Sequence, residues 1–543
     1  MAQATSASHP AEGALIMTLS GKIELSREAG KRIYHFHGGL RLRHNKKISC
    51  RDPVERPPLP EVLVVPLLQH AGDIADPLVH AGEKVLKGQP IGQCQPCAAV
   101  HSPVSGIVEA IEDRSMSHPS GQKGPCVVIR PDGREQWVEL NPLSDWLDAS
   151  PDSLIAQIQS CGLAGLGGAV FPTHAKMRDG RDRKTHTLIL NGVECEPYIS
   201  CDEMLMREQP DKIILGARVL RRVLGAQHVI IAIEDQMGSV QKSLTSCAEF
   251  TDSENISVVK VPKIYPEGGE RQLVQVLTGL EVPAGGRPSD LGLMCQNVAT
   301  AAAVAEAVTE GKPLIERYIT VTGNGISHPR NLLALFGTPV SILVDCCGGY
   351  TVDVARLVVG GPMMGFPLES DNSPVVKASN CVLALTGQDV AAPQPEMPCI
   401  RCGECARVCP AMLLPQQLHL QIRNELWKPL QDYGLSACIE CGCCDFVCPS
   451  HIPLVEWFRY GKGEIRKQAL ESEAAELARK RFEEREARLL RIKQERAQKM
   501  ARRKQALKDK TAQQERIRAS IQRAEDKGRT KLEGSGNGAN NDT

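Results

Sequence analysis

Hydrophobic and polar positions change pattern several times along the chain, and each pattern predicts a different kind of structure. Apolar residues at helical spacing in AMLLPQQLHLQIRNELWKPL, residues 411–430, predict a helical insert. The run LILNG at 188–192 predicts a buried strand that leads into an acidic loop. From about residue 461 the chain has strong helix formers and almost no apolar stripe, which predicts a long solvated helix before a disordered GSGNGANNDT end.

The composition narrows the class of protein. A chain of 543 residues has room for three or four domains, and 42% hydrophobic residues can form their cores. No uninterrupted apolar run approaches the roughly 18 residues of a transmembrane helix. The amino terminus lacks the order of a secretory signal, so we expect a cytoplasmic protein. In such a chain, 21 cysteines indicate metal or redox chemistry more than disulfides.

The charge is unevenly distributed although its net value is zero. The body is acidic and the tail is basic, with nine basic against two acidic residues across 491–510. Such a tail is either a solvated helix without a specific partner or a segment attracted to an acidic surface.

Two cysteine runs share one spacing, CIRCGECARVCP at 399–410 and CIECGCCDFVCP at 438–449. The pattern C-x2-C-x2-C-x3-C-P is the bacterial ferredoxin run, in which the fourth cysteine binds the other [4Fe–4S] cluster. The predicted ligand sets are Cys399, Cys402, Cys405 and Cys448 for one cluster, and Cys438, Cys441, Cys444 and Cys409 for the other. Structural zinc also uses C-x2-C pairs but requires neither the third cysteine nor Cys-Pro. Cys443 is interpreted as a bystander.

Two further segments are candidates for a binding site. In GLAGLGGAVFPTHAKM, residues 162–177, glycines would let backbone N–H groups approach a phosphate and Lys176 could add positive charge. A glycine turn between a helix and a strand is the alternative. The segment NGVECEP at 191–197 is either a site loop or a capped surface turn.

These segments resemble the flavin- and NADH-binding subunit of respiratory complex I. GLGGAVFPTHAK resembles its FMN loop and NGVECEP its Asn-x-x-Glu-Gly-Glu-Pro loop, while YPEGGERQL (265–273) and QNVAT (296–300) resemble two further segments. The resemblance implies FMN and NADH as cofactors. It implies cofactor binding by Gly165, Gly167, Gly168, Lys176, Asn191 and Asn297, and catalytic roles beside flavin and nicotinamide for Glu194 and Glu196. Cys195 replaces that family's glycine.

A third pattern precedes these segments. HAGEKVLKGQPIGQ and AVHSPVSGIVEAIE match the two halves of a biotinyl or lipoyl domain, a small flattened β-barrel. The hairpin that carries a lysine in a working carrier domain reads CQPCAAV here, so we expect the fold without covalent biotin or lipoate. With GGL at 38–40 and NKKIS at 45–49, residues 30–460 resemble the RnfC/RsxC family of Rnf electron-transport complexes. In that family, 317–349 would belong to a β-grasp domain, which its strand-turn-strand pattern supports.

The predicted fold class is therefore α/β multidomain. The predicted order is an N-terminal extension (1–29), a biotinyl/lipoyl-like β-barrel without the carrier lysine (30–140), an α/β FMN- and NADH-binding domain (141–310), a β-grasp domain of the SLBB type (311–375), a helical ferredoxin-type domain with two [4Fe–4S] clusters (376–460) and a charged helical tail (461–543).

The resemblance implies an NADH-dependent oxidoreductase subunit of an ion-translocating Rnf complex. It would be peripheral on the cytoplasmic side of the bacterial inner membrane and would exchange electrons with membrane and ferredoxin-like subunits, without a nucleic-acid partner. Two alternatives are a cobalamin reductase of a bacterial microcompartment and a ferredoxin-type adaptor without flavin. The intact GLGGAVFPTHAK segment argues against the adaptor, and the basic tail favours the membrane complex. Direction of electron flow, coupling ion and terminal acceptor depend on other subunits.

Overall fold

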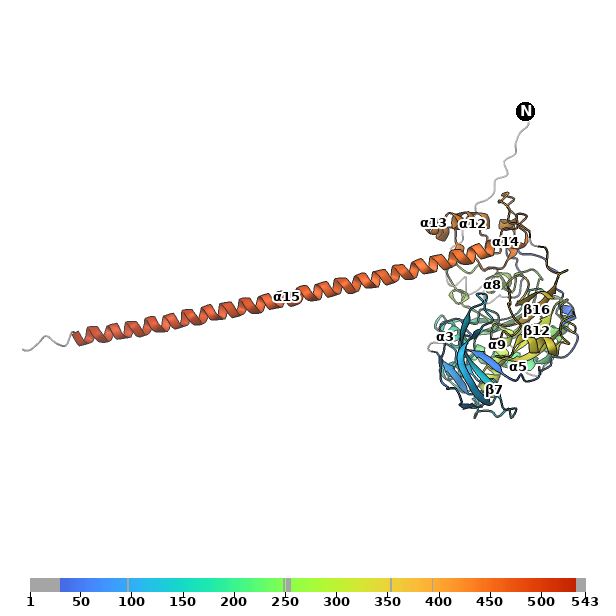
Figure 1. The fold of residues 1–543 in the computed structure, drawn as a ribbon, viewed down its shortest axis with the longest axis horizontal. Helices are drawn as coiled ribbons and strands as arrows, with labels where there is room; N and C mark the ends of the chain where they lie inside the picture. The colour runs from blue at the N-terminus through green and yellow to red at the C-terminus, as the bar shows by residue number, and fades with distance from the viewer. Residues whose placement is uncertain are drawn as a thin grey trace, which may run out of the picture. The chain divides into compact units, whose positions relative to one another are not determined.

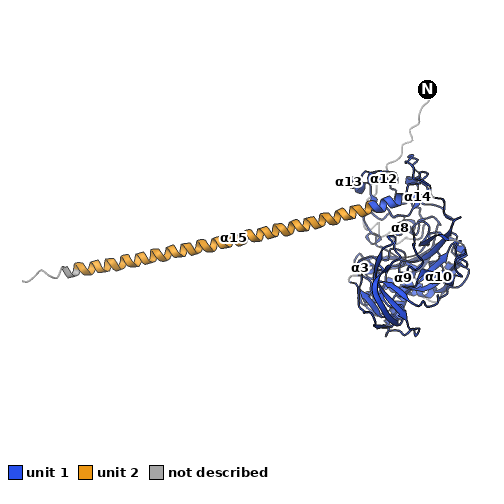
Figure 2. Ribbon diagram, viewed as in Figure 1, with its two compact units in different colours: residues 1–460 blue, residues 461–543 orange. Residues whose placement is uncertain are grey.

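The computed structural model describes residues 30–94, 97–247, 250, 255–351, 354–392 and 394–533. The chain divides into two units, residues 1–460 and 461–543, at the boundary where the sequence predicts that the tail begins (Figure 2). The predicted N-terminal extension and the predicted disordered end lie outside the described residues. Within the described part, no helix is long and apolar enough to cross a membrane.

A small antiparallel barrel forms the first strand-rich part of unit 1. One sheet has the order β1 (Leu63–Pro66), β7 (Lys123–Pro131), β6 (Gly106–Ser115) and β3 (Lys84–Val85), and the other has β2 (Asp76–Pro77), β4 (Pro90–Gln93) and β5 (Val100–His101). Val108, Val127 and Ile129 are fully buried between strands, because alternate side chains of a strand face the interior. The barrel is the fold that the two-half sequence pattern predicts.

Residues 30–62 precede the barrel strands and pack against other parts of unit 1. Backbone hydrogen bonds join Gly30 to Leu277 and Gly39 to Val408, at 2.8 and 3.0 Å. The predicted barrel segment 30–140 therefore begins with a stretch of chain that contacts domains far away in the sequence.

A parallel sheet forms the centre of the α/β domain. Its strand order is β10 (Ile256–Val261), β9 (His228–Glu234), β8 (Thr187–Gly192) and β11 (Leu293–Asn297). Its helices are α2 (Pro151–Ser160), α3 (Thr173–Asp182), α4 (Cys201–Glu208), α5 (Pro210–Leu224), α6 (Gly238–Ser246), α8 (Glu270–Thr278), η2 (Pro288–Leu291) and α9 (Val298–Thr309). A Cβ on Gly216 of α5 would lie 1.8 Å from the carbonyl oxygen of Ala301 in α9, so glycine permits the close approach of these helices.

A five-stranded sheet follows in the sequence. Its order is β13 (Arg330–Leu335), β12 (Glu316–Thr322), β16 (Cys381–Thr386), β14 (Val354–Val359) and β15 (Phe366–Pro367), with helix α10 (Val340–Cys346). β12 and β13 pair antiparallel, as the strand-turn-strand pattern predicts. Because β16 pairs with β12 and β14, the sheet continues past residue 375, where the sequence analysis ends this domain.

The cysteine-rich part of unit 1 is helical. It contains α11 (Glu404–Arg407), α12 (Pro415–Arg423), α13 (Trp427–Asp432), η3 (Leu435–Ala437) and α14 (Cys443–Phe446), and ends with the first turns of α15 (Leu454–Glu533). α12 and α13 confirm the predicted helical insert. α15 is continuous (Figure 1), and its side chains from Arg466 to Thr530 are all exposed, which confirms the predicted solvated helix.

A buried lysine joins three parts of unit 1. The ammonium group of Lys377 donates to the carbonyl oxygens of Ala99 in the barrel, at 3.2 Å, and Gly162 in the α/β domain, at 2.7 Å. Its burial lowers the pKa of this group to about 7. Arg317 of β12 donates to the carbonyl oxygens of Lys377 and Leu166. These bonds hold the barrel and the five-stranded sheet against the glycine-rich segment.

Candidate functional site

The strands of the parallel sheet end at one edge, where polar residues gather. β8 and β11 pair in register so that Asn191 lies beside Asn297, and β9 ends at Glu234. The strand order reverses between β8 and β11, and such reversals create ligand crevices at the carboxyl ends of strands. We define the carboxyl-edge site as Asn191, Glu194, Glu234, Glu267, Asn297 and the glycine loop 162–172, together with Lys46, which lies beside Glu234.

The glycine loop is folded by its own backbone. The amide of Gly165 donates to the carbonyl oxygen of Phe171 at 2.9 Å, which closes the loop. The amide of Leu166 donates to the hydroxyl of Thr300 in the first turn of α9, also at 2.9 Å. The loop is therefore fixed against the end of β11 and the start of α9.

The tip of the loop presents exposed main chain. Gly167 lies against Asn297, since an added Cβ would be 3.1 Å from the Cβ of Asn297. Gly168 has φ +105°, a conformation that L side chains rarely adopt, and both glycines are exposed. Without side chains here, backbone groups of the tip are open to the approach of an anionic ligand.

Lys176 lies one turn into α3, which follows the glycine loop. Its ammonium group is 2.7 Å from a carboxylate oxygen of Glu270, the first residue of α8, and both side chains are partly exposed. This ion pair connects the GLGGAVFPTHAK segment with YPEGGERQL, so two segments that resemble the same flavin subunit are neighbours in the fold.

The two asparagines hold the loops that leave β8 and β11. The Asn191 amide donates to the carbonyl oxygen of Gly268 at 2.9 Å. The side-chain oxygen of Asn297 accepts from the amide of Ala299 and caps α9, while its nitrogen donates to Asp202 at 2.5 Å. Both side chains thus connect the strand ends to neighbouring loops.

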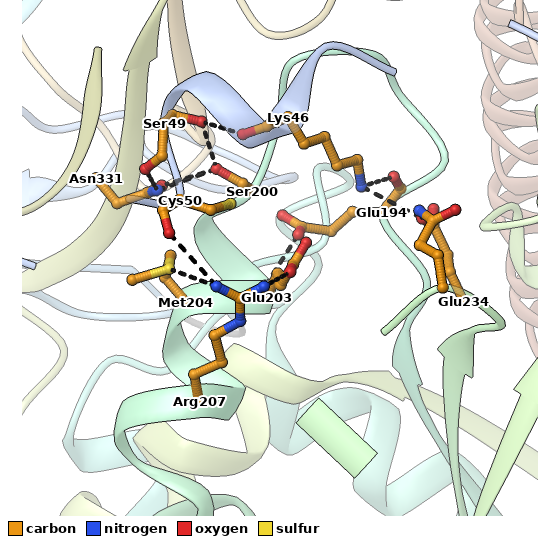
Figure 3. A network of polar contacts seen from close by, with 11 residues as sticks. Lys46, Ser49, Cys50, Glu194, Ser200, Glu203, Met204, Arg207, Glu234 and Asn331 are labelled. Atoms are coloured by element: carbon orange, nitrogen blue, oxygen red, sulfur yellow. Dashed lines mark hydrogen bonds and ion pairs between the residues drawn. The ribbon is translucent and has the colours of Figure 1, made fainter. Parts of the chain in front are cut away.

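The carboxylate of Glu194 lies at the amino-terminal end of α4 and is held there by backbone amides. Its carboxylate accepts from the amides of Asp202 and Glu203, both at 2.9 Å. Lys46, from the short helix η1 (Lys46–Ile48), donates to the carbonyl oxygen of Glu194 and lies 3.6 Å from the carboxylate of Glu234 (Figure 3). A residue more than 140 positions earlier in the sequence therefore completes the carboxyl-edge site.

The charges of Lys46 and the neighbouring glutamates are buried, and each affects the pKa values of the others. Burial by itself would lower the pKa of the Lys46 ammonium, but Glu194, Glu234 and Glu203 raise it above its ordinary value. Glu234 is 1% exposed, and burial raises its pKa to about 7 against the opposing effect of Lys46. The lysine therefore stays charged and compensates part of the negative charge.

Glu196 connects the site to the five-stranded domain. Its carboxylate accepts from the amides of Met363 and Met364, at 3.2 and 2.8 Å. Gly361 leaves space for it, because a Cβ there would be 2.3 Å from a carboxylate oxygen. Burial raises the pKa of Glu196 to about 7, although the two amide bonds lower it.

Glu267 is the carboxyl group of the site without protein donors among the described residues. It is 1% exposed, and neither carboxylate oxygen has a hydrogen-bond partner in that part of the chain. Burial raises its pKa to about 8, the nearby backbone of Ile264 opposes this change, and the charge of Glu234 contributes to it. A buried carboxyl with a strongly raised pKa at the carboxyl edge of a parallel sheet is a candidate for a ligand-binding or catalytic group.

Three residues of this site, Lys46, Glu234 and Glu267, were absent from the sequence prediction. Lys46 belongs to NKKIS and Glu267 to YPEGGERQL, two segments that the resemblance did single out. Glu234 ends a strand that reads as HVIIAIE, and its position after a buried run is the signal that could have identified it.

The eight predicted cluster ligands line two separate cavities. One cavity is lined by Cys399, Cys402, Cys405 and Cys448 together with Ile400, Arg401, Gly403, Gln416, His419, Pro449, Ser450, Ile452 and Leu454. The other is lined by Cys409, Cys438, Cys441 and Cys444 together with Cys443, Pro410, Ala411, Leu413, Pro415, Ile439, Val455 and Phe458. We call them the first and second cysteine cavities. The grouping is the one expected when each fourth cysteine crosses to the other cluster.

The second cysteine cavity touches the carboxyl-edge site. The hydroxyl of Tyr265, two residues before Glu267, donates to the carbonyl oxygen of Cys441 at 2.6 Å. Tyr265, Cys441 and Cys443 belong to one buried cluster, against which Cys195 and other partly buried residues pack. The loop between Glu194 and Glu196 is thereby in contact with the wall of a cysteine cavity.

Family models match four parts of the chain. The RnfC barrel sandwich hybrid domain matches residues 34–134, the Nuo51 FMN-binding domain 158–306, the SLBB domain 318–367 and the 4Fe-4S dicluster domain 398–453. These matches confirm the predicted fold class. The class is a multidomain protein that combines an FMN-binding type of domain with a 4Fe-4S dicluster type of domain.

Curated relatives define the family within this class. The C subunit of the ion-translocating oxidoreductase complex of Yersinia pestis bv. Antiqua is 42% identical over 496 residues, which cover 91% of this chain and 79% of the relative. Its namesake from Pseudomonas aeruginosa is 45% identical over 467 residues, 86% of this chain and 60% of the relative. The chain belongs to this family, the RnfC family, as the sequence resemblance predicts.

The chain spans about three fifths of the length of several relatives, among them those of Pseudomonas aeruginosa and Vibrio cholerae. Among solved structures, NAD+-reducing [NiFe]-hydrogenase in the air-oxidized state is 17% identical with a TM-score of 0.40, covering 56% of this chain and 62% of that chain. That likeness is too low to bear on the site.

Glu267 should make the stability of the protein depend on pH. A carboxyl whose pKa is raised on folding binds its proton more tightly in the folded state, so stability falls as pH rises from about 4.5 to about 8. Glu267→Gln should therefore have a higher melting temperature than the parent at pH 8.5, and this advantage should shrink towards pH 5. The measurement is anaerobic thermal unfolding at both pH values, with exposed Glu61→Gln as the control for loss of one carboxylate. A difference that does not change with pH would contradict the assignment.

Proposed function

We propose that this chain passes electrons between NADH, FMN and two [4Fe–4S] clusters, as the electron-input subunit of a membrane-bound, ion-translocating Rnf-type oxidoreductase. The observation that carries the proposal is the contact between the carboxyl-edge site and the second cysteine cavity through Tyr265 and Cys441. A cofactor crevice that touches a cluster-type cavity is the arrangement that intramolecular electron transfer requires. Membership of the RnfC family supports the assignment to such a complex.

The glycine loop fits FMN by its exposed main chain. Gly165, Gly167 and Gly168 would hold the phosphate or the ring edge, Asn297 would border the loop, and Lys176 would share its charge between Glu270 and the phosphate. When bound, FMN accepts a hydride as two electrons and releases them one at a time, which iron–sulfur clusters alone cannot do. The match to an FMN-binding domain across this loop supports the proposal.

The nicotinamide side is assigned to Asn191, Glu194 and Glu196. Because both glutamates accept two backbone hydrogen bonds, their carboxyl groups are already held in place for a ligand. Glu267 joins them as the buried carboxyl that has no protein donor among the described residues and can therefore accept or donate a hydrogen bond to a ligand. Cys195 packs against the cluster that contains Tyr265 and Cys441.

The proposed electron path has an order. The residues that line either cavity all come from the cysteine-rich part of the chain. The second cavity differs in that Cys441 of its wall accepts a hydrogen bond from Tyr265, two residues before Glu267. In the proposed path the cluster held by Cys409, Cys438, Cys441 and Cys444 is next to the flavin. The cluster held by Cys399, Cys402, Cys405 and Cys448 then faces a neighbouring protein of the complex.

The basic tail suggests a way in which the protein associates with the membrane surface. An anionic leaflet attracts basic segments by roughly 1 kcal/mol per residue close to the surface, and salt screens this attraction. The segment 491–510, with its nine basic and two acidic residues, is exposed along α15 and suits such an interaction. We propose a peripheral protein on the cytoplasmic face of the inner membrane, whose body binds the integral subunits while the tail adds a salt-sensitive contribution.

Gly167→Val should weaken FMN binding roughly tenfold or more, because the added Cβ would crowd Asn297 and the branched side chain would cover the loop tip. The readouts are flavin released on denaturation after reconstitution with FMN, and reduction of ferricyanide by NADH. Gly238→Val is the control, since the Cβ position of this exposed glycine at the start of α6 has no described atom within 4 Å. If the parent protein itself retains no flavin and shows no activity, the flavin-free adaptor is the better assignment.

Cys402→Ser and Cys438→Ser should each lower the iron content from about eight to about four per chain, since each removes a ligand of a different [4Fe–4S] cluster. The two variants should differ in the number of reduced clusters that electron paramagnetic resonance detects after anaerobic protein is mixed with NADH. Cys402→Ser should still show one reduced cluster, whereas Cys438→Ser should show almost none, because it interrupts the path beside the flavin. Cys443→Ser is the control and should keep both clusters, although Cys443 lines the second cavity. The reverse pattern would contradict the proposed order.

A chain that ends at Lys462 should still associate with membranes when the integral Rnf subunits are present, but should be released at lower salt than the full-length chain. The measurement is cell fractionation at increasing salt, with and without those integral subunits. Full-length protein that remains in the soluble fraction although they are present would rule out the complex. Equal salt resistance of the two forms would rule out a role for the tail.

A further inference from the structure

A second group of candidate metal ligands lies in the barrel, where a working carrier domain has its lysine hairpin. The loop 67–75 connects β1 and β2 and is closed by a hydrogen bond from the amide of Ala75 to the carbonyl oxygen of Leu67, at 3.1 Å. β2 pairs with β4 so that Asp76 faces Gln93, the residue before Cys94. This register brings the loop beside the two ends of the hairpin, Cys94 and Cys97.

Three donor atoms meet at this point. A ring nitrogen of His70 and the sulfur atoms of Cys94 and Cys97 all lie within 4.8 Å of one another. His70 and Cys97 are each 5% exposed, and Cys94 is partly buried. None of the three lines either of the cysteine cavities.

His70 is the member of the group that lacks a partner. Both of its ring nitrogens are shielded from solvent and have no hydrogen-bond partner among the described residues. A buried imidazole without partners is costly, because the protein gives it no replacement for the hydrogen bonds of water. A bond from one nitrogen to a metal ion would remove much of that cost.

The backbone is shaped around the sulfur atoms. Gly72 has φ +140°, and an added Cβ would lie 2.9 Å from the sulfur of Cys97, so glycine allows the loop to approach the hairpin. The neighbouring amide of Ala71 donates to the carbonyl oxygen of Val170 in the glycine loop, at 3.0 Å. The group therefore lies next to a backbone contact with the carboxyl-edge site.

Cys94 and Cys97 are joined as a disulfide in this structure, with a Cα–Cα distance of 5.0 Å. A disulfide accounts for the two sulfur atoms but leaves His70 without a partner among the described residues. A phosphine reduces the disulfide with two electrons, while one water molecule gives its oxygen to the resulting phosphine oxide and its two protons to the sulfur atoms, so that both thiols are restored. Two thiols and an imidazole are then the donor types that zinc prefers.

We propose that His70, Cys94 and Cys97 bind one zinc ion in the reduced protein. Binding releases the two thiol protons, so that both sulfur atoms coordinate as thiolates. Zinc takes four ligands, and water fills the fourth position. The ion ties the loop 67–75 to the hairpin at the place where a carrier domain would bear its prosthetic group.

The test uses the full-length chain, purified anaerobically with a phosphine reductant, and measures zinc and iron by mass spectrometry. The parent should carry about one zinc ion in addition to its iron. X-ray absorption at the zinc edge should show two sulfur atoms at about 2.3 Å and nitrogen or oxygen atoms at about 2.0–2.1 Å. Zinc misplaced into a ferredoxin-type cysteine set would instead show four sulfur atoms, which would overturn the proposal.

His70→Asn and Cys97→Ser should each lose most of the zinc and keep the iron. Cys126→Ser is the matched control, because Cys126 is a buried cysteine of the same barrel whose sulfur donates to the carbonyl oxygen of Gly124, a bond that serine can replace. Retention of zinc by His70→Asn would overturn the proposal. So would a reduced parent protein that contains no more zinc than Cys97→Ser.

Discussion

The parallel pairing of β8 with β9 and β11 is the constraint on which the candidate site depends. Parallel strands end at the same edge of a sheet, so their loops must share one small region. Asn191, Glu234 and Asn297 meet there although more than 100 residues separate the first from the last. The glycine loop is held at the same place by Thr300, because the hydroxyl lies in the first turn of the helix that follows β11.

Buried charge is the second feature of this region, and other parts of unit 1 help to compensate it. Lys46, from the segment before the barrel, donates to the carbonyl oxygen of Glu194 and lies 3.6 Å from the carboxylate of Glu234, which reduces the free-energy cost of burying Glu234. Glu196 is held instead by amides of the five-stranded domain. Neither carboxylate oxygen of Glu267 has a hydrogen-bond partner among the described residues, which distinguishes it from the other glutamates of the site.

Contacts between domains give the proposed electron path its order. Tyr265 ties the carboxyl-edge site to Cys441, so the second cysteine cavity is the neighbour of the proposed flavin site. Lys377 and Arg317, which follow the α/β domain in the sequence, hold the barrel and the five-stranded sheet against the glycine loop. The four family models match the parts of the chain that these contacts join.

The sequence by itself determined the features that depend on local spacing. Cysteine runs such as that of Cys399 predict cluster ligands because three of the four donors lie within one short loop. The charged tail is predicted to be a solvated helix because it has no apolar stripe to bury. The fold class followed from the families that such segments resemble and from their order along the chain. Tertiary structure alone decided that Lys46 meets Glu234, that Tyr265 meets Cys441 and that His70 meets the hairpin. Each of these contacts joins residues that are distant in the sequence. Burial removes water from their side chains and shifts their pKa values, and burial is a property of the packed fold that no local sequence pattern predicts.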